Sequence, residues 1–219
     1  MVEQKSLASV ERGRDMSRIG AFSDGVFAIA ITLLVLQLEV RPGIGSTPEF
    51  WRALGDQTAN LISFAISFAV IGRLWYLHHR FMQMVREFDP RLIALNLLYL
   101  FFNVLIPFTS ELVGDYGLEV PMVTVIYTGN VALVTLVASL MYRRSFTEQL
   151  VHPEYRDLTE TGTKAVLFAA GSLVATMPLV LVLGPYTPLT WFIIFRLNPY
   201  DRRRKRLAPG DGGTPSAGD

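Results

Sequence analysis

Long apolar runs separated by short polar and charged stretches dominate the chain. A helix that rises 1.5 Å per residue needs about 20 residues to cross a hydrocarbon core of about 30 Å. The first five runs meet this length. The sixth has only 12 residues and would span about 18 Å, so it crosses only if flanking arginines snorkel or the bilayer thins. The pattern predicts an all-α membrane protein with six transmembrane helices per subunit. The runs are Ile19–Val40, Ala59–Leu77, Leu92–Leu112, Val120–Tyr142, Ala165–Leu183 and Tyr186–Leu197.

The lysines and arginines favour an even number of spans. All but Arg41 and Arg52 lie in the N-terminal segment, around the second loop, beside the fourth loop or at the C-terminal end. Positive residues mark the cytoplasmic loops, so we expect both termini in the cytoplasm. A five-span chain would break this alternation.

Composition narrows the class further. Hydrophobic residues make up 51% of the chain, the net charge is +1, and there is no cysteine for a disulfide, a thiolate metal site or a catalytic thiol. The basic clusters are topology signals, so no nucleic-acid partner is expected, and no cleavable signal peptide is visible. We expect a cytoplasmic segment at 1–17, one membrane domain at 18–200, and a basic tail at 201–219 that is disordered after Leu207.

The first run carries an aliphatic stripe on one side. On a helical wheel, Leu33 and Leu36 fall within about 40° of Ile29, and Thr32 lies about 60° to one side. Ser23 and Asp24 lie about 120° and 140° away from Ile29 on the same wheel. The stripe either contacts lipid or a neighbouring helix, or it lines a pore that symmetry-related copies close by dewetting.

A short motif begins this run and carries a family resemblance. Arg18, Phe22, Ser23 and Asp24 form the pattern R-x-x-x-F-S-D, which GVFAIAITLLVL follows. This string resembles the signature of the transmembrane protein 175 family of lysosomal-type potassium channels. Further matches lie on the second and third runs, at Trp75, His78, Asn96 and Pro107.

The resemblance implies a fold and a function. It implies a homotetramer of six-helix units in the lipid bilayer, a prokaryotic single-repeat form, with the first helices lining a central pore that conducts potassium ions. Ile29 would form the narrowest ring, and Leu33 and Leu36 the next apolar layers. Thr32 would confer potassium preference, with potassium ions passing near Ile29 and Thr32. No cofactor is implied beyond the permeant ion.

An apolar constriction would be an unusual filter. The sequence has no TVGYG-like loop, so a cage of backbone carbonyls cannot supply selectivity. Isoleucine offers no ligand to a cation, so a ring of Ile29 side chains can only block passage until it widens. One set of residues would then serve as both gate and constriction.

The motif residues are expected to hold the helix in place. Arg18, Phe22, Ser23 and Asp24 should form a structural network with Trp75 and His78, because a carboxylate at this depth needs a donor. Direct ion binding and proton sensing through His78 remain alternatives.

Other residues at bilayer depth have simpler interpretations. Adjacent histidines on a helix project about 100° apart, so His78 and His79 do not form a metal site. Proline inside the third and fifth runs, at Pro107 and Pro178, should kink those helices. The tryptophans Trp51, Trp75 and Trp191 are interpreted as interface anchors. Asparagines in the runs should hydrogen-bond across helices; they are Asn60, Asn96, Asn103 and Asn130.

Three other functional classes are weighed against a channel. An intramembrane enzyme would need a nucleophile with a base or a metal cluster at bilayer depth, and the sequence shows neither. A cation- or proton-coupled secondary transporter usually has inverted repeats and midplane ionisable groups, and no inverted halves are visible. A non-conducting membrane scaffold stays open on composition alone.

Overall fold

The computed structural model describes residues 2–39, 43–197 and 200, and every regular element in that part of the chain is helical. The predicted all-α fold class is therefore confirmed. In chain order the elements are α1 (Val2–Leu33), η1 (Leu34–Gln37), α2 (Thr47–Asp56), α3 (Thr58–Met84), α4 (Pro90–Tyr116), α5 (Pro121–Thr147), η2 (Pro153–Tyr155), α6 (Arg156–Ala175), η3 (Met177–Leu179), α7 (Val180–Leu183), η4 (Gly184–Tyr186) and α8 (Leu189–Arg196). The η elements are short 3₁₀-helices.

Five helical stretches among the described residues are long and apolar enough to cross a membrane. They correspond to the first five predicted runs. The sixth run coincides with α8, whose eight residues rise only about 12 Å, so a sixth span stays a prediction. The five stretches are Met16–Gln37, Thr58–Met84, Pro90–Tyr116, Pro121–Thr147 and Pro153–Tyr186.

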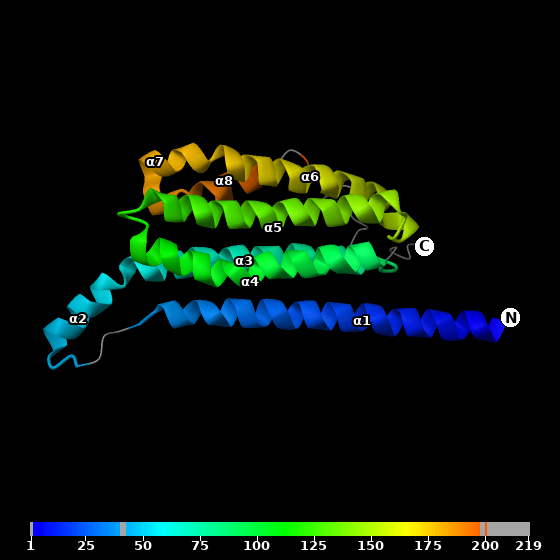
Figure 1. Cartoon of the computed structure of the whole chain (residues 1–219), viewed down its shortest axis with the longest axis horizontal. Coiled ribbons are helices and arrows are strands. Elements are labelled where there is room, and N and C mark those ends of the chain that lie inside the picture. Colours follow the sequence, from blue (N-terminus) through cyan, green and yellow to red (C-terminus); the bar gives the residue numbers. More distant parts are fainter. Residues whose placement is uncertain (1, 40–42, 198–199, 201–219) are drawn as a thin grey trace, which may run out of the picture.

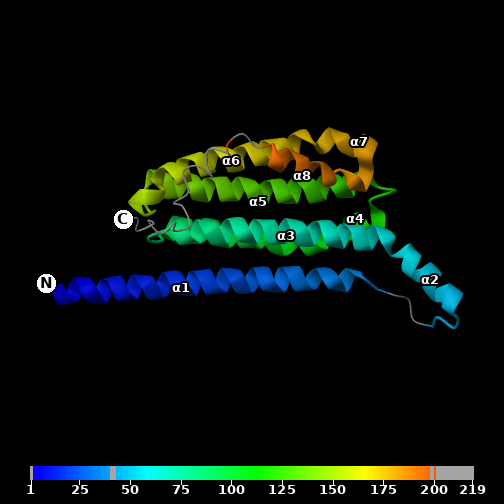
Figure 2. The same ribbon diagram turned by 180° about the vertical axis from the view of Figure 1, so that it is seen from behind.

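The helices run back and forth in layers (Figure 1). α1 lies along one side of the bundle and packs on α3 and α4. Next come α5 and then α6 with α8, as both views show (Figure 2). We call the end at which α3 meets α4 the inner end of the bundle, and the end at which α1 gives way to α2 the outer end.

The helices extend beyond the apolar runs that predicted them. α1 continues without a break from Val2, so the expected boundary between residues 17 and 18 is no interruption of secondary structure. In the fifth stretch α6 ends at Ala175, before Pro178, and the 3₁₀-helix η3 and the short α-helix α7 follow. Proline cannot donate its backbone nitrogen to the helical ladder. The predicted tail at 201–219 lies outside the described residues.

The short helix α2 was not predicted from the sequence. It extends away from the outer end of the bundle (Figures 1 and 2), and none of its residues is buried. Ser46 caps it by accepting a hydrogen bond from the Glu49 N–H at 3.4 Å. The sequence S-x-x-E followed by Phe50 and Trp51 is a recognisable helix start.

The core corrects the role expected for one tryptophan. Trp191 on α8 is 1% exposed, stacks on Tyr127 of α5 with ring centroids 5.8 Å apart, and donates to the Thr176 hydroxyl at 3.2 Å. The prediction that Trp191 anchors the protein at the interface is therefore wrong. Its indole instead fixes α8 against α5 and the end of α6.

Glycine allows α6 to approach α5 closely. A Cβ atom on Gly162 would lie 2.6 Å from a ring carbon of Tyr142, a distance that side-chain carbons do not tolerate. Gly114 of α4 makes a similar close approach to the Asn60 side chain of α3. At these two positions the absence of a side chain sets the spacing of the helices.

Polar contacts join the loops at the inner end. The Arg86 N–H donates to the Leu150 carbonyl at 2.7 Å, which ties the α3–α4 loop to the α5–α6 loop. Asp89 caps α4 by accepting from the Leu92 N–H at 2.8 Å. The same carboxylate accepts from Arg144 Nε of α5 at 3.0 Å.

Candidate ion pathway along the first helix

The first helix, here taken as α1 with its continuation η1, has one face buried against α3 and α4. Its members recur at spacings of three and four residues, which places them on one side of a helix. They combine apolar packing with a polar group at each end of the buried stretch. The face consists of Ser23, Phe27, Ala30, Leu34 and Gln37.

The opposite face of α1 is open in the protomer. Ile29 is 62% exposed and Leu36 is 66% exposed, while Leu33 on the flank is 39% exposed. Thr32 is exposed as well. The structure thus brings together Ile29, Thr32, Leu33 and Leu36, the four residues singled out on the first run. None of them is buried inside its own protomer.

The Thr32 hydroxyl has a defined orientation. Its Oγ1 donates to the Ile29 carbonyl at 2.9 Å, one turn earlier in the helix. Because the hydroxyl hydrogen is used within the helix, the lone pairs of the oxygen remain available as acceptors. An exposed oxygen of this kind can replace part of the hydration shell of a cation.

Asp24 has the donor that its position requires. Trp75 Nε1 of α3 donates to Asp24 Oδ1 at 2.9 Å. The Trp75 ring also stacks on His79, with centroids 5.6 Å apart, so its plane is fixed. This contact joins α1 to α3 near the inner end.

Ser23 joins α1 to the bundle through Asn96. Asn96 Nδ2 of α4 donates to Ser23 Oγ at 3.1 Å, and the Asn96 Oδ1 lies 2.8 Å from His78 Nε2. Ser23 Oγ in turn donates to the Ile19 carbonyl at 2.9 Å. His78 is therefore placed near the motif, but its partner is Asn96 and not Asp24. The sequence predicted that Asn96 bonds across helices, but not that it joins Ser23 to His78.

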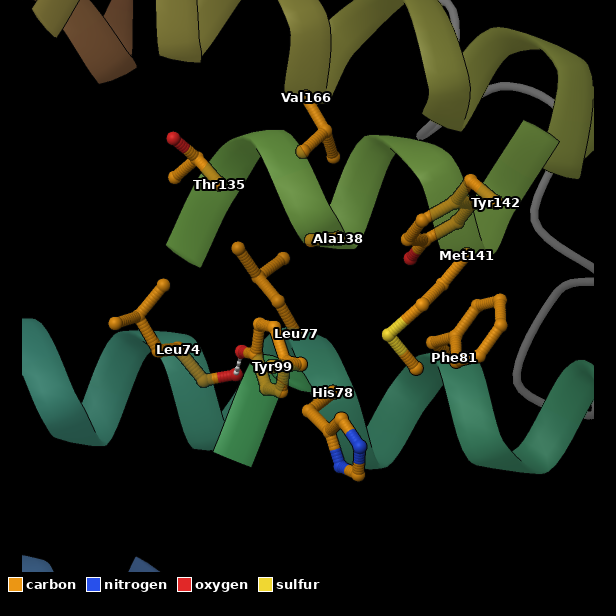
Figure 3. A pocket seen from close by; sticks show the side chains of 10 residues that line it. All are labelled: Leu74, Leu77, His78, Phe81, Tyr99, Thr135, Ala138, Met141, Tyr142 and Val166. Atoms are coloured by element: carbon orange, nitrogen blue, oxygen red, sulfur yellow. Dashed lines mark hydrogen bonds between the residues drawn. The ribbon is translucent and has the colours of Figure 1, made fainter. Parts of the chain in front are cut away.

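Aromatic rings hold His78 in place. Its imidazole stacks on Tyr99 with centroids 5.1 Å apart, and the Phe27 ring lies 5.5 Å away. Figure 3 shows the His78 ring directed away from α5, beside a small cavity of about 30 Å³ that Leu74, Tyr99 and Met141 help to line. The Tyr99 hydroxyl donates to the Leu74 carbonyl at 3.2 Å.

Arg18 and Phe22 lie outside this network. Both line a pocket of about 550 Å³ between α1 and the start of α4, together with Phe88 and Ile93. Arg18 makes no ion pair with the side chains that the structure describes from Met16 onward. Of the six residues expected to form one network, Asp24 is bonded directly to Trp75, and Ser23 is connected to His78 through Asn96.

The asparagines follow the expectation in part. Asn60 Nδ2 donates to Asp115 at 3.1 Å, and Asn130 Nδ2 donates to the Phe102 carbonyl at 3.2 Å, so both bond across helices. Asn103 Nδ2 donates to the Tyr99 carbonyl within its own helix at 2.8 Å. For Asn103 the prediction of a bond between helices is wrong.

Arg73 lies inside α3, as its place in the run Ala59–Leu77 predicted, and its guanidinium carbon is 5.8 Å from the centroid of the Tyr76 ring.

The sequence profile of the family described as endosomal/lysosomal potassium channel TMEM175 matches residues 18–107. A potassium channel of Streptomyces collinus is 34% identical to this chain over 179 residues, which cover 79% of this chain and 86% of the relative. The chain belongs to the TMEM175 family. The match begins at Arg18, the first residue of the motif.

Further TMEM175 relatives agree with this assignment. A potassium channel of Chamaesiphon minutus is 31% identical over 162 residues, covering 72% of this chain and 80% of the relative. The crystal structure of a lysosomal potassium-selective channel TMEM175 homolog from the same organism has 27% sequence identity and a TM-score of 0.73, covering 87% of this chain and 98% of that chain. The bovine endosomal/lysosomal proton channel TMEM175 is 35% identical over 92 residues, covering 39% of this chain and 19% of the relative.

Proposed function

We propose that this protein is a potassium-selective channel in which four copies place their α1 helices around a central pore. The observation that carries the proposal is the exposed aliphatic stripe of α1, with Ile29 62% exposed and Leu36 66% exposed, in a chain whose relatives are named potassium channels. Each protomer supplies one wall. A closed ring of identical walls requires a cyclic homo-oligomer, and four is the number that the family resemblance implies.

The Ile29 ring acts as constriction and gate. Isoleucine has no atom that can bind a cation, so a narrow ring of these side chains excludes water and stops conduction. Leu33 and Leu36 add apolar layers toward the outer end. Opening then requires the α1 helices to rotate or move apart until the ring is wide enough to hydrate.

Thr32 favours potassium over sodium. Potassium is larger and more weakly hydrated, so it loses water more readily at an apolar ring. Each Thr32 hydroxyl donates to the Ile29 carbonyl and presents its lone pairs outward, where four copies supply oxygen ligands beside the constriction. Potassium ions pass near Ile29 and Thr32 in this arrangement.

The inner contacts of α1 keep the pore wall attached to the bundle. The bonds from Trp75 to Asp24 and from Asn96 to Ser23 lie on the sides of α1 away from Ile29. Asp24 and Ser23 therefore act as structural anchors and do not bind permeant ions. The protein lies in the plasma membrane with six spans and both termini in the cytoplasm.

Substitution of the constriction tests the proposal. Ile29→Asn places amides in the ring, which hydrate it, so we expect a higher unitary conductance and a potassium-to-sodium permeability ratio closer to one. The measurement is a bilayer recording of purified protein under a potassium gradient. Val104→Asn serves as a matched control, because Val104 is an exposed aliphatic residue of α4 and should leave both quantities unchanged.

Other outcomes identify other functions. Unchanged current and selectivity in Ile29→Asn would reject Ile29 as the constriction. Saturable flux coupled to a second ion would indicate a carrier, and no flux at all would indicate a scaffold. Flux that follows the proton gradient alone would mean that the permeant ion is the proton, the ion in the name of the bovine relative.

A further inference from the structure

The outer end of α1 changes its helical form where it leaves the stripe. Residues Leu34–Gln37 form the 3₁₀-helix η1, and Gln37 is 8% exposed despite its place at the end of an apolar helix. Its Nε2 donates to the Pro107 carbonyl at 2.9 Å, and its Oε1 accepts from Ser110 Oγ at 3.2 Å. Both ends of the carboxamide are therefore bound to α4.

These bonds continue as a buried chain of hydroxyl groups. Ser67 Oγ of α3 donates to Ser110 Oγ at 2.8 Å, and Ser63 Oγ donates to the Ser110 carbonyl at 2.7 Å. Ser67 Oγ also lies 2.9 Å from the hydroxyl of Tyr127 on α5. The Gln37 side chain thus connects the pore helix to three further helices, and buried groups in such chains have little freedom to shift separately.

The form of η1 decides where the outer apolar layers point. A 3₁₀-helix turns by about 120° per residue and an α-helix by about 100°. Converting the four residues from the 3₁₀ form to the α form would therefore rotate the end of the helix by about 80° and shorten it by about 2 Å. Leu36 lies within η1, so its direction depends on which form the segment takes.

We propose that Gln37 is a positioning residue for the gate: its bonds to Pro107 and Ser110 hold the outer end of α1 in the 3₁₀ form and set the direction of Leu36 toward the pore axis. This inference rests on the proposed function, because it takes α1 as the pore wall. The Asp24 and Ser23 contacts fix the inner half of α1, whereas Gln37 fixes the outer half.

A pair of substitutions separates the hydrogen bonds from the shape of the side chain. In Gln37→Glu the protonated carboxyl group can donate to the Pro107 carbonyl and accept from Ser110, whereas the carboxylate can only accept. We expect wild-type open probability at about pH 4.5 and a change of roughly tenfold at about pH 8, the size expected for losing one or two such bonds. Gln37→Leu should show the changed gating at both values.

The recordings are normalised to wild type at each pH. The described groups that face the carboxamide are hydroxyls and a carbonyl, and Tyr127 is the titratable member of the chain. Glu39 and Glu111, which are not buried, are present in every variant, so normalisation removes their contribution.

Asn130→Asp is the matched control. Asn130 Nδ2 also donates to a backbone carbonyl of α4, that of Phe102, but does not touch α1. The substitution makes the same change from a carboxamide to a carboxylic acid, so we expect reduced thermal stability with unchanged open probability. Acid-dependent gating in Asn130→Asp like that in Gln37→Glu would overturn the proposal.

The remaining outcomes decide between the two proposals. Wild-type gating in Gln37→Glu and Gln37→Leu at both pH values, with Ile29→Asn altered in the same preparation, would overturn the role of Gln37 alone. Unaltered Ile29→Asn would remove the pore wall itself. Should neither Gln37 variant assemble, Ser110→Ala breaks one of the two bonds, and unchanged gating in that variant would also overturn the proposal.

Discussion

At the residue scale, the polar side chains at the inner half of α1 act in pairs with named partners. Asn96 is 1% exposed, donates to Ser23 and is bonded to His78. Asn103, about two helical turns further along α4, is equally buried but bonds only within its own helix, and its Oδ1 has no partner among the described residues. The same residue type thus makes opposite contributions on one helix.

This difference gives a stability prediction. Asn96→Leu leaves His78 Nε2 buried without its partner, which should cost about 1–3 kcal/mol and lower the melting temperature by roughly 3–10 °C. Asn103→Leu removes an unsatisfied polar atom and should be neutral or stabilising. Melting in detergent followed by tryptophan fluorescence measures both, and equal losses in the two variants would contradict the network.

At the scale of elements, the start of α4 is fixed by Asp89, which both caps the helix and pairs with Arg144 of α5. Arg144 also donates to Glu148 at 2.7 Å, so its guanidinium bridges two carboxylates. Partial desolvation favours the neutral acid, but the hydrogen bonds from Arg144 and from the Leu92 N–H outweigh it and hold the pKa of Asp89 below its usual value.

The lowered pKa predicts how stability depends on pH. A carboxyl whose pKa is lower in the folded state stabilises the fold above about pH 4, its unfolded value, and this contribution is lost as pH falls through the folded value. Asp89→Asn keeps a capping side chain but loses the charge, so it should cost about 0.5–1 kcal/mol at neutral pH. Asp89→Ala should cost about 1 kcal/mol more.

Melting temperatures between about pH 3 and pH 7 test this prediction. The gap between wild type and Asp89→Asn should close at the acid end, because wild-type Asp89 then loses its charge as well. A gap that stays constant over the whole range would show that the ion pair with Arg144 does not stabilise the protein.

At the scale of the whole molecule, the count of spans decides where the termini lie. Five described stretches have the length of a span, and α8 follows as a short helix that runs back toward the inner end (Figure 1). An even number of crossings returns the chain to the side from which it started. The alternation of basic residues favours that outcome.

The absence of cysteine from the sequence permits a direct test of topology. Single cysteines are introduced by Ser6→Cys, Ser216→Cys and Gly45→Cys, and intact cells are treated with a membrane-impermeant maleimide. We expect labelling of Gly45→Cys alone, with the two terminal variants labelled only after the cells are opened. Labelling of Ser216→Cys in intact cells would mean an odd number of spans.

The aliphatic stripe of the first helix and the five long spans could be predicted from the sequence, because apolar length and helical periodicity are local properties. The amphipathic helix α2 carried a local signal in Ser46 and Glu49 but lay in a segment treated as a loop. The partner of His78, the burial of Trp191 and the intrahelical bond of Asn103 could not be predicted. Each depends on which helix lies opposite, and the sequence of one helix does not contain that information.

The sequence by itself determined that the chain crosses a membrane, where its first helix has an aliphatic face, and which family motif begins that helix. The reason is that hydrophobic length and a 3.6-residue period require no knowledge of neighbours. Only the tertiary structure decided that the aliphatic face is open while the opposite face is packed, and that Gln37 binds a carbonyl and a hydroxyl far along the chain. Hydrogen bonds between residues distant in sequence exist only after the helices have packed.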